Sequence, residues 1–187
     1  MLPFLEIAYA LRGLWRLVHL DPHGLEYFDR SVAGFWRSFR VAFLVLPAYA
    51  LLIPARMTLS PPTAGWPRVF VVEILTYLIG WVAFPVAAYE ICRRIGREAE
   101  FPGLIVVYNW ANVPSVLLWI IVAGFLVSPS LLGLGILLSY ATQAAVFGFV
   151  WFISRTALGV DGMTALIFAI LDFAVSNILA ALTHLME

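Results

Sequence analysis

Three strongly polar residues, each near the middle of a separate apolar stretch, have side chains that could do chemistry. They are Asn112, Gln143 and Asp172. At a rise of about 1.5 Å per residue, Asn112 lies roughly 14 Å, and the other two roughly 15 Å, from the arginine-rich end of their stretches. Such groups are costly in hydrocarbon and often mark ion or proton pathways. We therefore predict one polar cluster at a common depth between three membrane helices.

Asp172 is compatible with two roles, which the sequence leaves open. No arginine lies at its depth, so we expect its carboxyl group to be protonated and to donate a hydrogen bond to an amide. Such a cluster can simply fix helix packing, or it can form a proton or solute path. Small residues, which allow close helix approach, follow one face around it. This face comprises Ala165, Ala169, Ser176, Ala180 and Thr183, and a similar face of the preceding stretch carries Gly135, Ser139 and Thr142.

Three further polar residues are predicted to be secondary sites. Asn109 lies in the same stretch as Asn112, and Asn177 lies in the outer part of the stretch that contains Asp172. Glu73 is about one turn inside the outer end of its own stretch. We therefore expect Glu73 to be either solvated or paired with His184.

Signatures of catalysis are missing from the sequence. It has no His-Glu-x-x-His, Gly-x-Ser-x-Gly, Gly-x-x-x-x-Gly-Lys or Cys-x-x-Cys motif. Cys92 is the only cysteine, which excludes an intramolecular disulfide, and the three histidines are scattered. The formal net charge is zero, so no overall charge attracts nucleic acid. We predict a non-enzyme with no catalytic residue, no metal, no cofactor and no nucleic-acid partner.

Helices must position these polar residues, because five apolar stretches are long enough to cross a membrane. Of the 187 residues, 63% are hydrophobic and only 12% are charged, against about 25% charged residues in soluble domains. A spanning helix needs about 20 mainly apolar residues. We predict an all-α fold, a membrane bundle whose transmembrane domain covers residues 32–187. The five predicted helices cover residues 34–55, 69–91, 103–127, 131–153 and 162–184.

Arginine supplies all 11 basic charges, and its distribution predicts the orientation. With the N-terminus in the cytoplasm, only Arg56 and Arg68 lie outside, which leaves the other nine inside. The absence of lysine favours a bacterial source, so we expect the bacterial inner membrane, with the C-terminus outside. Besides the bilayer, the expected partners are other membrane proteins or further copies of this chain. The arginines predicted to contact lipid headgroups are Arg12, Arg16, Arg37, Arg40, Arg93, Arg94 and Arg97.

Residues 1–31 are predicted to form a cytoplasmic segment of a different kind. Glu6, Arg12 and Arg16 interrupt its apolar run, so we expect neither a signal peptide nor a membrane span. A period of 3.6 residues predicts an amphipathic helix over residues 2–20, lying either on the inner membrane surface or on the protein's own cytoplasmic face. The next helix is predicted to start at an N-cap, Ser31. The apolar face of the amphipathic helix would comprise Phe4, Ile7, Leu11, Leu14, Trp15 and Val18.

The third apolar stretch carries the segment Tyr108-Asn109-Trp110-Ala111-Asn112-Val113-Pro114. The layout of the chain is an N-terminal region followed by five closely spaced spans, with this segment in the third. It resembles the Yip family of five-span membrane proteins, including its short bacterial members. The similarity covers residues 35–184, and the segment is similar to the tyrosine, small-residue and proline pattern of the family's third span. The resemblance implies a non-enzymatic role in membrane organisation, or as a partner of other membrane proteins.

Two functions are therefore expected. The first is a non-catalytic scaffold or accessory subunit that organises the membrane or partner membrane proteins. The alternative is a small oligomeric transporter or channel with a polar pathway around Asp172. A water-filled cavity that reaches Asp172 would favour the alternative, whereas a dry and sealed polar cluster would favour the scaffold.

Overall fold

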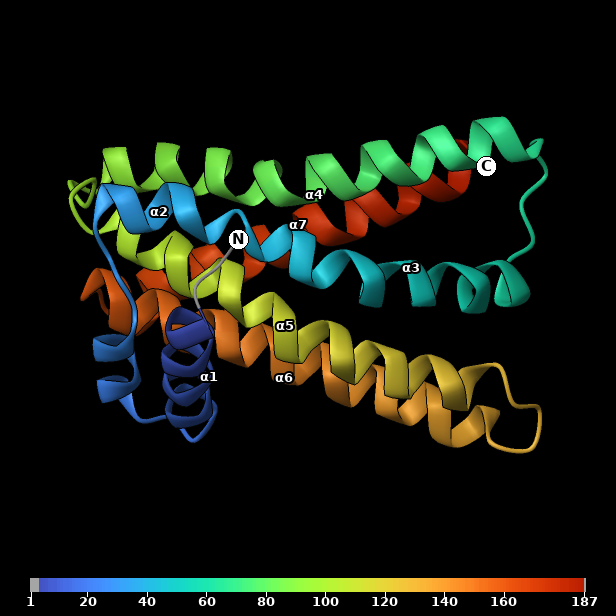
Figure 1. The fold of residues 1–187 in the computed structure, drawn as a ribbon, viewed down its shortest axis with the longest axis horizontal. Coiled ribbons are helices and arrows are strands. Elements are labelled where there is room, and N and C mark those ends of the chain that lie inside the picture. Colours follow the sequence, from blue (N-terminus) through green and yellow to red (C-terminus); the bar gives the residue numbers. More distant parts are fainter. Residues whose placement is uncertain (1–3, 187) are drawn as a thin grey trace.

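The computed structural model describes residues 4–186, and within this range every regular element is a helix, as the sequence predicts (Figure 1). Long apolar runs without strand-like alternation explain this fold class. The elements in chain order are α1 (Phe4–Val18), the 3-10 helix η1 (Pro22–Tyr27), α2 (Val32–Ser38), α3 (Val41–Leu59), α4 (Trp66–Arg94), α5 (Phe101–Leu126), α6 (Leu132–Leu158) and α7 (Gly162–Met186).

The five predicted spans are confirmed as helices that are long and apolar enough to cross a membrane. The first, Val32–Leu59, consists of α2 and α3 and is interrupted at Phe39 and Arg40. The other four are α4, α5, α6 and α7. Most of their bounds lie within three residues of the prediction, but α6 ends at Leu158 and not near residue 153.

The turn between α6 and α7 shows why the helices end where they do. Gly159 has a φ of 61°, in the left-handed region that glycine adopts without steric cost, and it terminates α6. Asp161 then accepts hydrogen bonds from the backbone N–H groups of Met163 and Thr164, at 2.8 and 3.1 Å. These bonds satisfy N–H groups that the first turn of α7 leaves without a helical partner.

Local hydrogen bonds also explain two other boundaries. The Ser31 hydroxyl accepts a hydrogen bond from the Gly34 N–H at 3.1 Å, so the predicted N-cap of α2 is confirmed. Between α5 and α6, the Leu131 N–H donates to the Ser128 carbonyl at 3.0 Å and closes a tight turn.

The bundle has two ends, which differ in charge. At one end, α4 and α6 end and α5 and α7 begin. We call it the basic end, because Arg93, Arg94, Arg97 and Arg155 lie there. The far end is where α3 leads to α4, where α5 leads to α6 and where α7 ends (Figure 1). α5 packs against both α3 and α6, and α7 packs against both α4 and α6. α5 and α7 therefore each connect two neighbouring helices, which makes the five spans one bundle.

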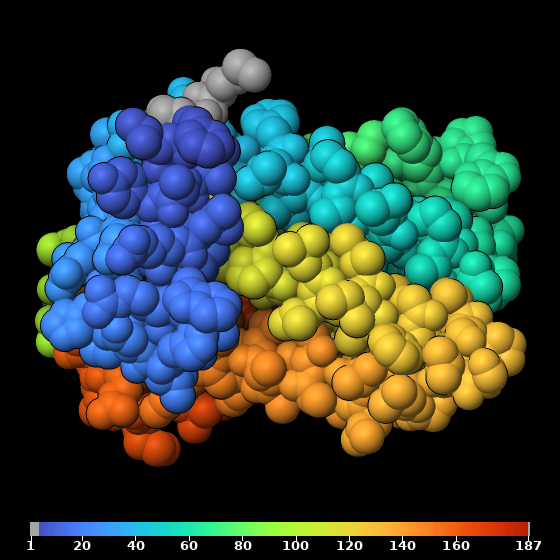
Figure 2. Space-filling view, turned by 60° about the horizontal axis from the view of Figure 1, so that its bottom comes forward, coloured from blue at the N-terminus to red at the C-terminus, as the bar shows by residue number. Residues whose placement is uncertain are grey.

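The helix α1 runs across the direction of the spans near the basic end, and η1 packs against it (Figure 1). The two elements meet at two glycines: a Cβ atom on Gly24 would lie 2.6 Å from the carbonyl oxygen of Gly13. No larger residue fits this approach without a backbone shift. Figure 2 shows that α1 and η1 cover the bundle at its basic end, whereas α5 stays uncovered further along.

The predicted apolar face of α1 is divided between two environments. Leu14 is buried and Ile7 is partly buried, together with Ala10 and Leu17, which the prediction had not included. The other four predicted residues are exposed, because the bundle and η1 contact only one side of the helix. We call them the exposed stripe: Phe4, Leu11, Trp15 and Val18.

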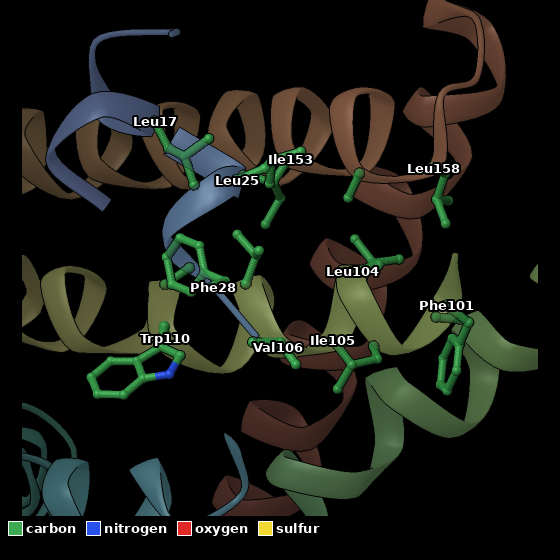
Figure 3. Close-up of a cluster of buried hydrophobic side chains, with 14 of the residues drawn as sticks. Leu17, Leu25, Phe28, Phe101, Leu104, Ile105, Val106, Trp110, Ile153 and Leu158 are labelled. Carbon is green, nitrogen blue, oxygen red and sulfur yellow. The ribbon is translucent and has the colours of Figure 1, made fainter. Parts of the chain in front are cut away.

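The hydrophobic core lies in the half of the bundle next to the basic end. Leu17 of α1 and Leu25 of η1 point towards Ile153 of α6 and Leu104 of α5 (Figure 3). Other fully buried members of this cluster are Trp110, Phe84, Phe168, Ile105 and Leu158. We call this half the packed half. The remaining half, towards the far end, holds a cavity.

Candidate functional site

A cavity of about 440 Å³ opens between the five spans, and we call it the central cavity. It extends from Asp172, in the middle of the bundle, to Arg56 and Thr183 near the far end. All five spans contribute to its wall, and its volume is typical of a small-molecule site. Its polar lining includes Tyr49, Glu73, Thr76, Asn112, Ser115 and Ser176.

Asp172 and Tyr108 form the inner floor of the central cavity. The Tyr108 hydroxyl donates a hydrogen bond of 2.6 Å to Oδ1 of Asp172. The ring of Tyr108 stacks on Phe84 with the ring centroids 4.1 Å apart, which holds the hydroxyl in place. Asp172 is only 7% exposed. The carboxyl group is thus fixed at the boundary between the packed half and the cavity.

The small-residue face of α7 explains how Asp172 comes so close to its neighbours. Ala165 and Ala169 are fully buried in the packed half, two turns and one turn before Asp172, respectively. On the far side, Ser176 and Ala180 line the central cavity. The predicted face therefore does point into the bundle, although only part of it is used for close packing.

A second charged group lies nearer the far end of the cavity. Glu73 of α4 forms an ion pair with Arg56 of α3 and accepts a hydrogen bond of 2.8 Å from the Tyr49 hydroxyl. Glu73 is only 5% exposed, so the prediction that it is solvated or paired with His184 is wrong. His184 instead lies 3.2 Å from the Ser60 hydroxyl. The physical reason is that α3 and α4 are antiparallel and connected at the far end, so that Arg56 and Glu73 lie at similar depths and their long side chains meet.

Aromatic side chains form much of the cavity wall. Tyr49 and Tyr77 have ring centroids 4.8 Å apart, and Tyr77 lies 6.2 Å from Trp81. The Tyr77 hydroxyl donates to the backbone carbonyl of Ala42, which anchors this group to α3. Trp119 of α5 also lines the cavity. The wall is therefore both apolar and rich in exposed π surfaces.

The predicted cluster of three polar residues needs correction. Asn112 and Asp172 do line the same cavity, but Gln143 is absent from its lining and contributes to a separate hollow beside Phe173. Asp172 accepts a hydrogen bond from Tyr108, whereas we had expected it to donate one to an amide. A depth estimate gives the level of a residue but not the direction in which its side chain points.

The three predicted asparagines bond either to a carbonyl of their own helix or to a neighbouring helix, where the bond fixes packing. The Asn112 amide donates to the Tyr108 carbonyl of its own helix at 3.2 Å. Asn109 is fully buried in the packed half and donates to the Ser38 hydroxyl at 2.8 Å. Asn177 is exposed and donates to the Phe173 carbonyl of its own helix at 2.7 Å. Of these amides, only Asn112 contributes to the cavity.

Most arginines that we predicted at lipid headgroups pair with carboxylates of the protein. Arg93 and Arg94 both lie 3.0 Å from Glu90, and Arg97 lies 3.3 Å from Glu100. These side chains are partly exposed, so their contact with headgroups stays a prediction.

The N-terminal arginines belong to a local network. Arg16 donates to Asp21 at 2.6 Å, which raises the pKa of Arg16 and lowers the pKa of Asp21. Arg12 lies over the ring of Tyr27 with 5.8 Å to its centroid. This network turns the arginine side of α1 towards η1.

Two more predicted arginines lie near the start of the first span. Arg37 pairs with Asp29 and lies 3.9 Å from Glu6 of α1, so it helps to hold α1 against the bundle. Arg40 is exposed at the interruption between α2 and α3. Contact of both side chains with headgroups also stays a prediction.

Sequence reasoning missed the three residues that bond to the acidic groups of the cavity: Tyr49, Arg56 and Tyr108. A signal for Arg56 existed, because it lies three residues before the end of α3 while Glu73 lies seven residues after the start of α4. Opposite charges at similar depth on the two arms of a hairpin can meet. Tyr108 stood in the segment that resembles the Yip family, but the pattern gave no reason to pair it with Asp172.

Comparisons with known proteins leave the family open: no family model, no curated protein and no solved structure matches this chain. Within residues 4–186, no group of three histidine, cysteine, aspartate or glutamate side chains could hold a metal ion. The fold and the cavity define a class, the all-helical proteins with several helices able to cross a membrane.

Proposed function

We propose that this protein is a non-enzymatic integral membrane protein that binds a small solute in the central cavity and carries it across the membrane. The observation that supports the proposal is that the cavity reaches Asp172. A carboxyl group at such a depth can exchange a proton or bind a cation, and polar groups inside membranes commonly serve these purposes. A sealed polar cluster would have favoured a purely structural role.

The packed half closes the central cavity towards the basic end, so a solute would enter the cavity from the far end. Between Asp172 and the basic end, buried side chains fill the space between the helices, and they include Phe168, Leu104 and Ile153. A solute in the central cavity therefore meets a closed barrier towards the basic end. Transport requires this barrier to open by relative movement of the spans, as in alternating access.

We also propose that the basic end faces the cytoplasm of a bacterial cell. The arginine bias supports this orientation, because positively charged connections are retained on the cytoplasmic side. Reporter fusions after Arg97 and Arg155 are expected to report the cytoplasm, and fusions near Thr63 or after Glu187 the outside. A cytoplasmic signal from the fusion after Glu187 would contradict the orientation.

Thiol labelling tests whether water reaches the cavity. Cys92 is buried and is the single cysteine, so a Cys92→Ala background allows one new thiol to be introduced. In proteoliposomes, a charged membrane-impermeant thiol reagent is expected to label Ser176→Cys, which lines the cavity. Ile170→Cys is the matched control, because Ile170 is an exposed residue of α7 outside the cavity lining. Labelling of neither position, or of both equally, would contradict a water-accessible cavity.

A scaffold remains a second candidate, and the exposed stripe of α1 is the observation that favours it. Helical periodicity places this stripe on the side of α1 away from η1, while Arg12 and Arg16 face Tyr27 of η1. An apolar side and a cationic side suit a helix that lies in a membrane surface or contacts another membrane protein.

A copurification experiment tests the scaffold. If the stripe recruits a partner membrane protein, as the resemblance to the Yip family implies, Leu11→Ser with Trp15→Ser is expected to abolish its copurification in mild detergent. Ser176→Cys, a change in the cavity, serves as the control and is expected to leave copurification intact. Unchanged copurification in the stripe variant would remove this candidate.

A further inference from the structure

The charges of the central cavity are not balanced, and this imbalance indicates what kind of solute fits. Glu73 and Arg56 compensate each other as an ion pair. Asp172 has a tyrosine as its hydrogen-bond partner, and no ion pair in residues 4–186 includes it. When Asp172 is ionised, the cavity therefore carries one net negative charge, and a cation is the solute that offsets it.

The walls of the cavity narrow the choice among cations. A small inorganic ion such as Ca²⁺ needs six to eight oxygen ligands, but only one carboxylate of the cavity lacks an ion-pair partner, and the lining around the cavity is mainly apolar and aromatic. Cations with apolar substituents lose little hydration in such a site and gain from the negative face of each ring. The aromatic residues of the wall are Tyr49, Tyr77, Trp81, Tyr108, Trp119 and Phe149.

We propose that the solute of the central cavity is a monovalent organic cation with apolar substituents, bound between the aromatic wall and Asp172. This inference rests on the proposed function and specifies its substrate class. Arg56 does not favour an organic anion, because its guanidinium group is already committed to Glu73. A neutral solute would leave the charge of Asp172 without compensation in a site of low polarity.

Binding of a matched pair of probes tests the charge of the solute. We expect the purified full-length protein to bind benzyltrimethylammonium at least tenfold more tightly than benzenesulfonate, an anion of similar size, measured by titration calorimetry. Asp172→Asn keeps an acceptor for the Tyr108 hydroxyl but loses the charge, so it is expected to weaken binding of the cation at least tenfold. Glu98→Gln is the control, because Glu98 is an exposed carboxylate at the basic end and lies outside the cavity lining. It should bind as the wild type does.

The aromatic wall is tested by a second substitution. Trp119→Leu keeps an apolar side chain but removes one π surface, and it is expected to weaken the cation roughly 3- to 30-fold, the usual range of a cation–π contact. Binding of the anion should not change. Equal affinity for the two probes, or an unchanged affinity in both Asp172→Asn and Trp119→Leu, would overturn the proposal.

Protection of an introduced thiol keeps the test independent of how Asp172→Asn folds. Benzyltrimethylammonium, but not benzenesulfonate, is expected to slow the labelling of Ser176→Cys in the Cys92→Ala background. If the thiol is labelled and neither probe slows the reaction, the solute is not an organic cation although the cavity is open to water. If the thiol is never labelled, the proposed function itself fails. The two failures are therefore distinguishable.

Discussion

The packed half and the cavity half of this bundle are built from the same five spans, yet they contain different chemistry. In the packed half, α1 and η1 close over α5 and α6, and large apolar side chains fill the interior (Figure 3). In the cavity half, tyrosines, a buried ion pair and Asp172 line an open space. The difference is set by where residues lie along and around each helix and not by which helices take part.

Two polar pairs make the contrast concrete. Asn109 and Ser38 bond to each other out of reach of solvent in the packed half, where a polar contact can only fix the positions of α2 and α5. Tyr108 is the adjacent residue on α5, and it bonds to Asp172 where the cavity begins. Adjacent residues of a helix point in directions about 100° apart, so the direction of each side chain around α5 separates a structural pair from one that lines the cavity.

Two tryptophans of α5 give the largest expected contrast between the halves. Trp110 is 1% exposed in the packed half, so Trp110→Ala is expected to lower the free energy of unfolding by about 3–5 kcal/mol. Trp119 lines the cavity, so Trp119→Ala should cost only about 1 kcal/mol. Unfolding in mixed micelles with increasing denaturing detergent, followed by circular dichroism, measures both. Equal losses would show that the cavity half is as tightly packed as the other.

The ion pair in the cavity half is expected to have the next largest effect. Arg56→Gln leaves Glu73 buried without its cation and should cost about 2 kcal/mol, less than the 3–5 kcal/mol of a fully buried pair, because the Arg56 side chain is 37% exposed. The double variant with Glu73→Gln should recover part of the loss, since no uncompensated charge remains. The same unfolding assay checks this, and strictly additive losses would argue against a coupled pair.

The bond at the boundary between the halves should have a smaller effect on stability. Tyr108→Phe removes the donor to Asp172 and is expected to cost about 0.6–1.7 kcal/mol, the range of polar contacts between membrane helices. Asp172→Asn should be nearly silent, because its amide oxygen can still accept from the tyrosine, and Asp172→Leu should be modestly destabilising. A large loss from Asp172→Asn would place the carboxylate charge itself among the groups that hold the fold together.

The smallest expected effect lies at the surface of the basic end. Hydrogen bonds from the Thr164 hydroxyl and from backbone N–H groups lower the pKa of Asp161. Because the folded pKa is lower than the unfolded value of about 3.9, the stabilisation is present above that value and is lost as the pH falls through the folded pKa.

A comparison of two proteins isolates this effect from other carboxylates. Asp161→Asn still caps α7 but does not titrate. Any stability advantage of the wild type over Asp161→Asn at pH 6 should therefore shrink progressively as the pH falls below about 4, as thermal unfolding at several pH values would measure. A difference between the two proteins that does not change with pH would contradict this role.

The spans were predictable from the sequence because each needs only a long apolar run, which is a local property. The N-cap at Ser31 was predictable for the same reason. The side of α1 that packs against the bundle was not predictable, because the apolar residues of α1 follow two adjacent faces of the helix. Periodicity alone could not tell that Leu14 is buried while Trp15 is 69% exposed.

The candidate site was predictable only in part. The burial of Asp172 followed from its small-residue neighbours on α7, which allow close helix contact. Its partner did not follow, because the rotation of each helix decides which side chain faces the carboxyl group. In addition, α6 ends at Leu158 and not near residue 153, so Gln143 lies further from the basic end than its predicted depth. The pairing of Glu73 with Arg56 likewise depends on how closely α3 and α4 approach each other.

The contact between Gly13 and Gly24 also bears on the order in which the chain assembles. These residues are eleven positions apart, so bringing them together costs little loop-closure entropy. Helical turns and short loops form within microseconds, whereas a chain is synthesised at about 5–20 residues per second. The unit of α1 and η1 can therefore form as soon as it leaves the ribosome, before the spans that follow it are inserted. A segment that is already folded resists translocation, and this would reinforce the proposed orientation, in which the basic end stays in the cytoplasm.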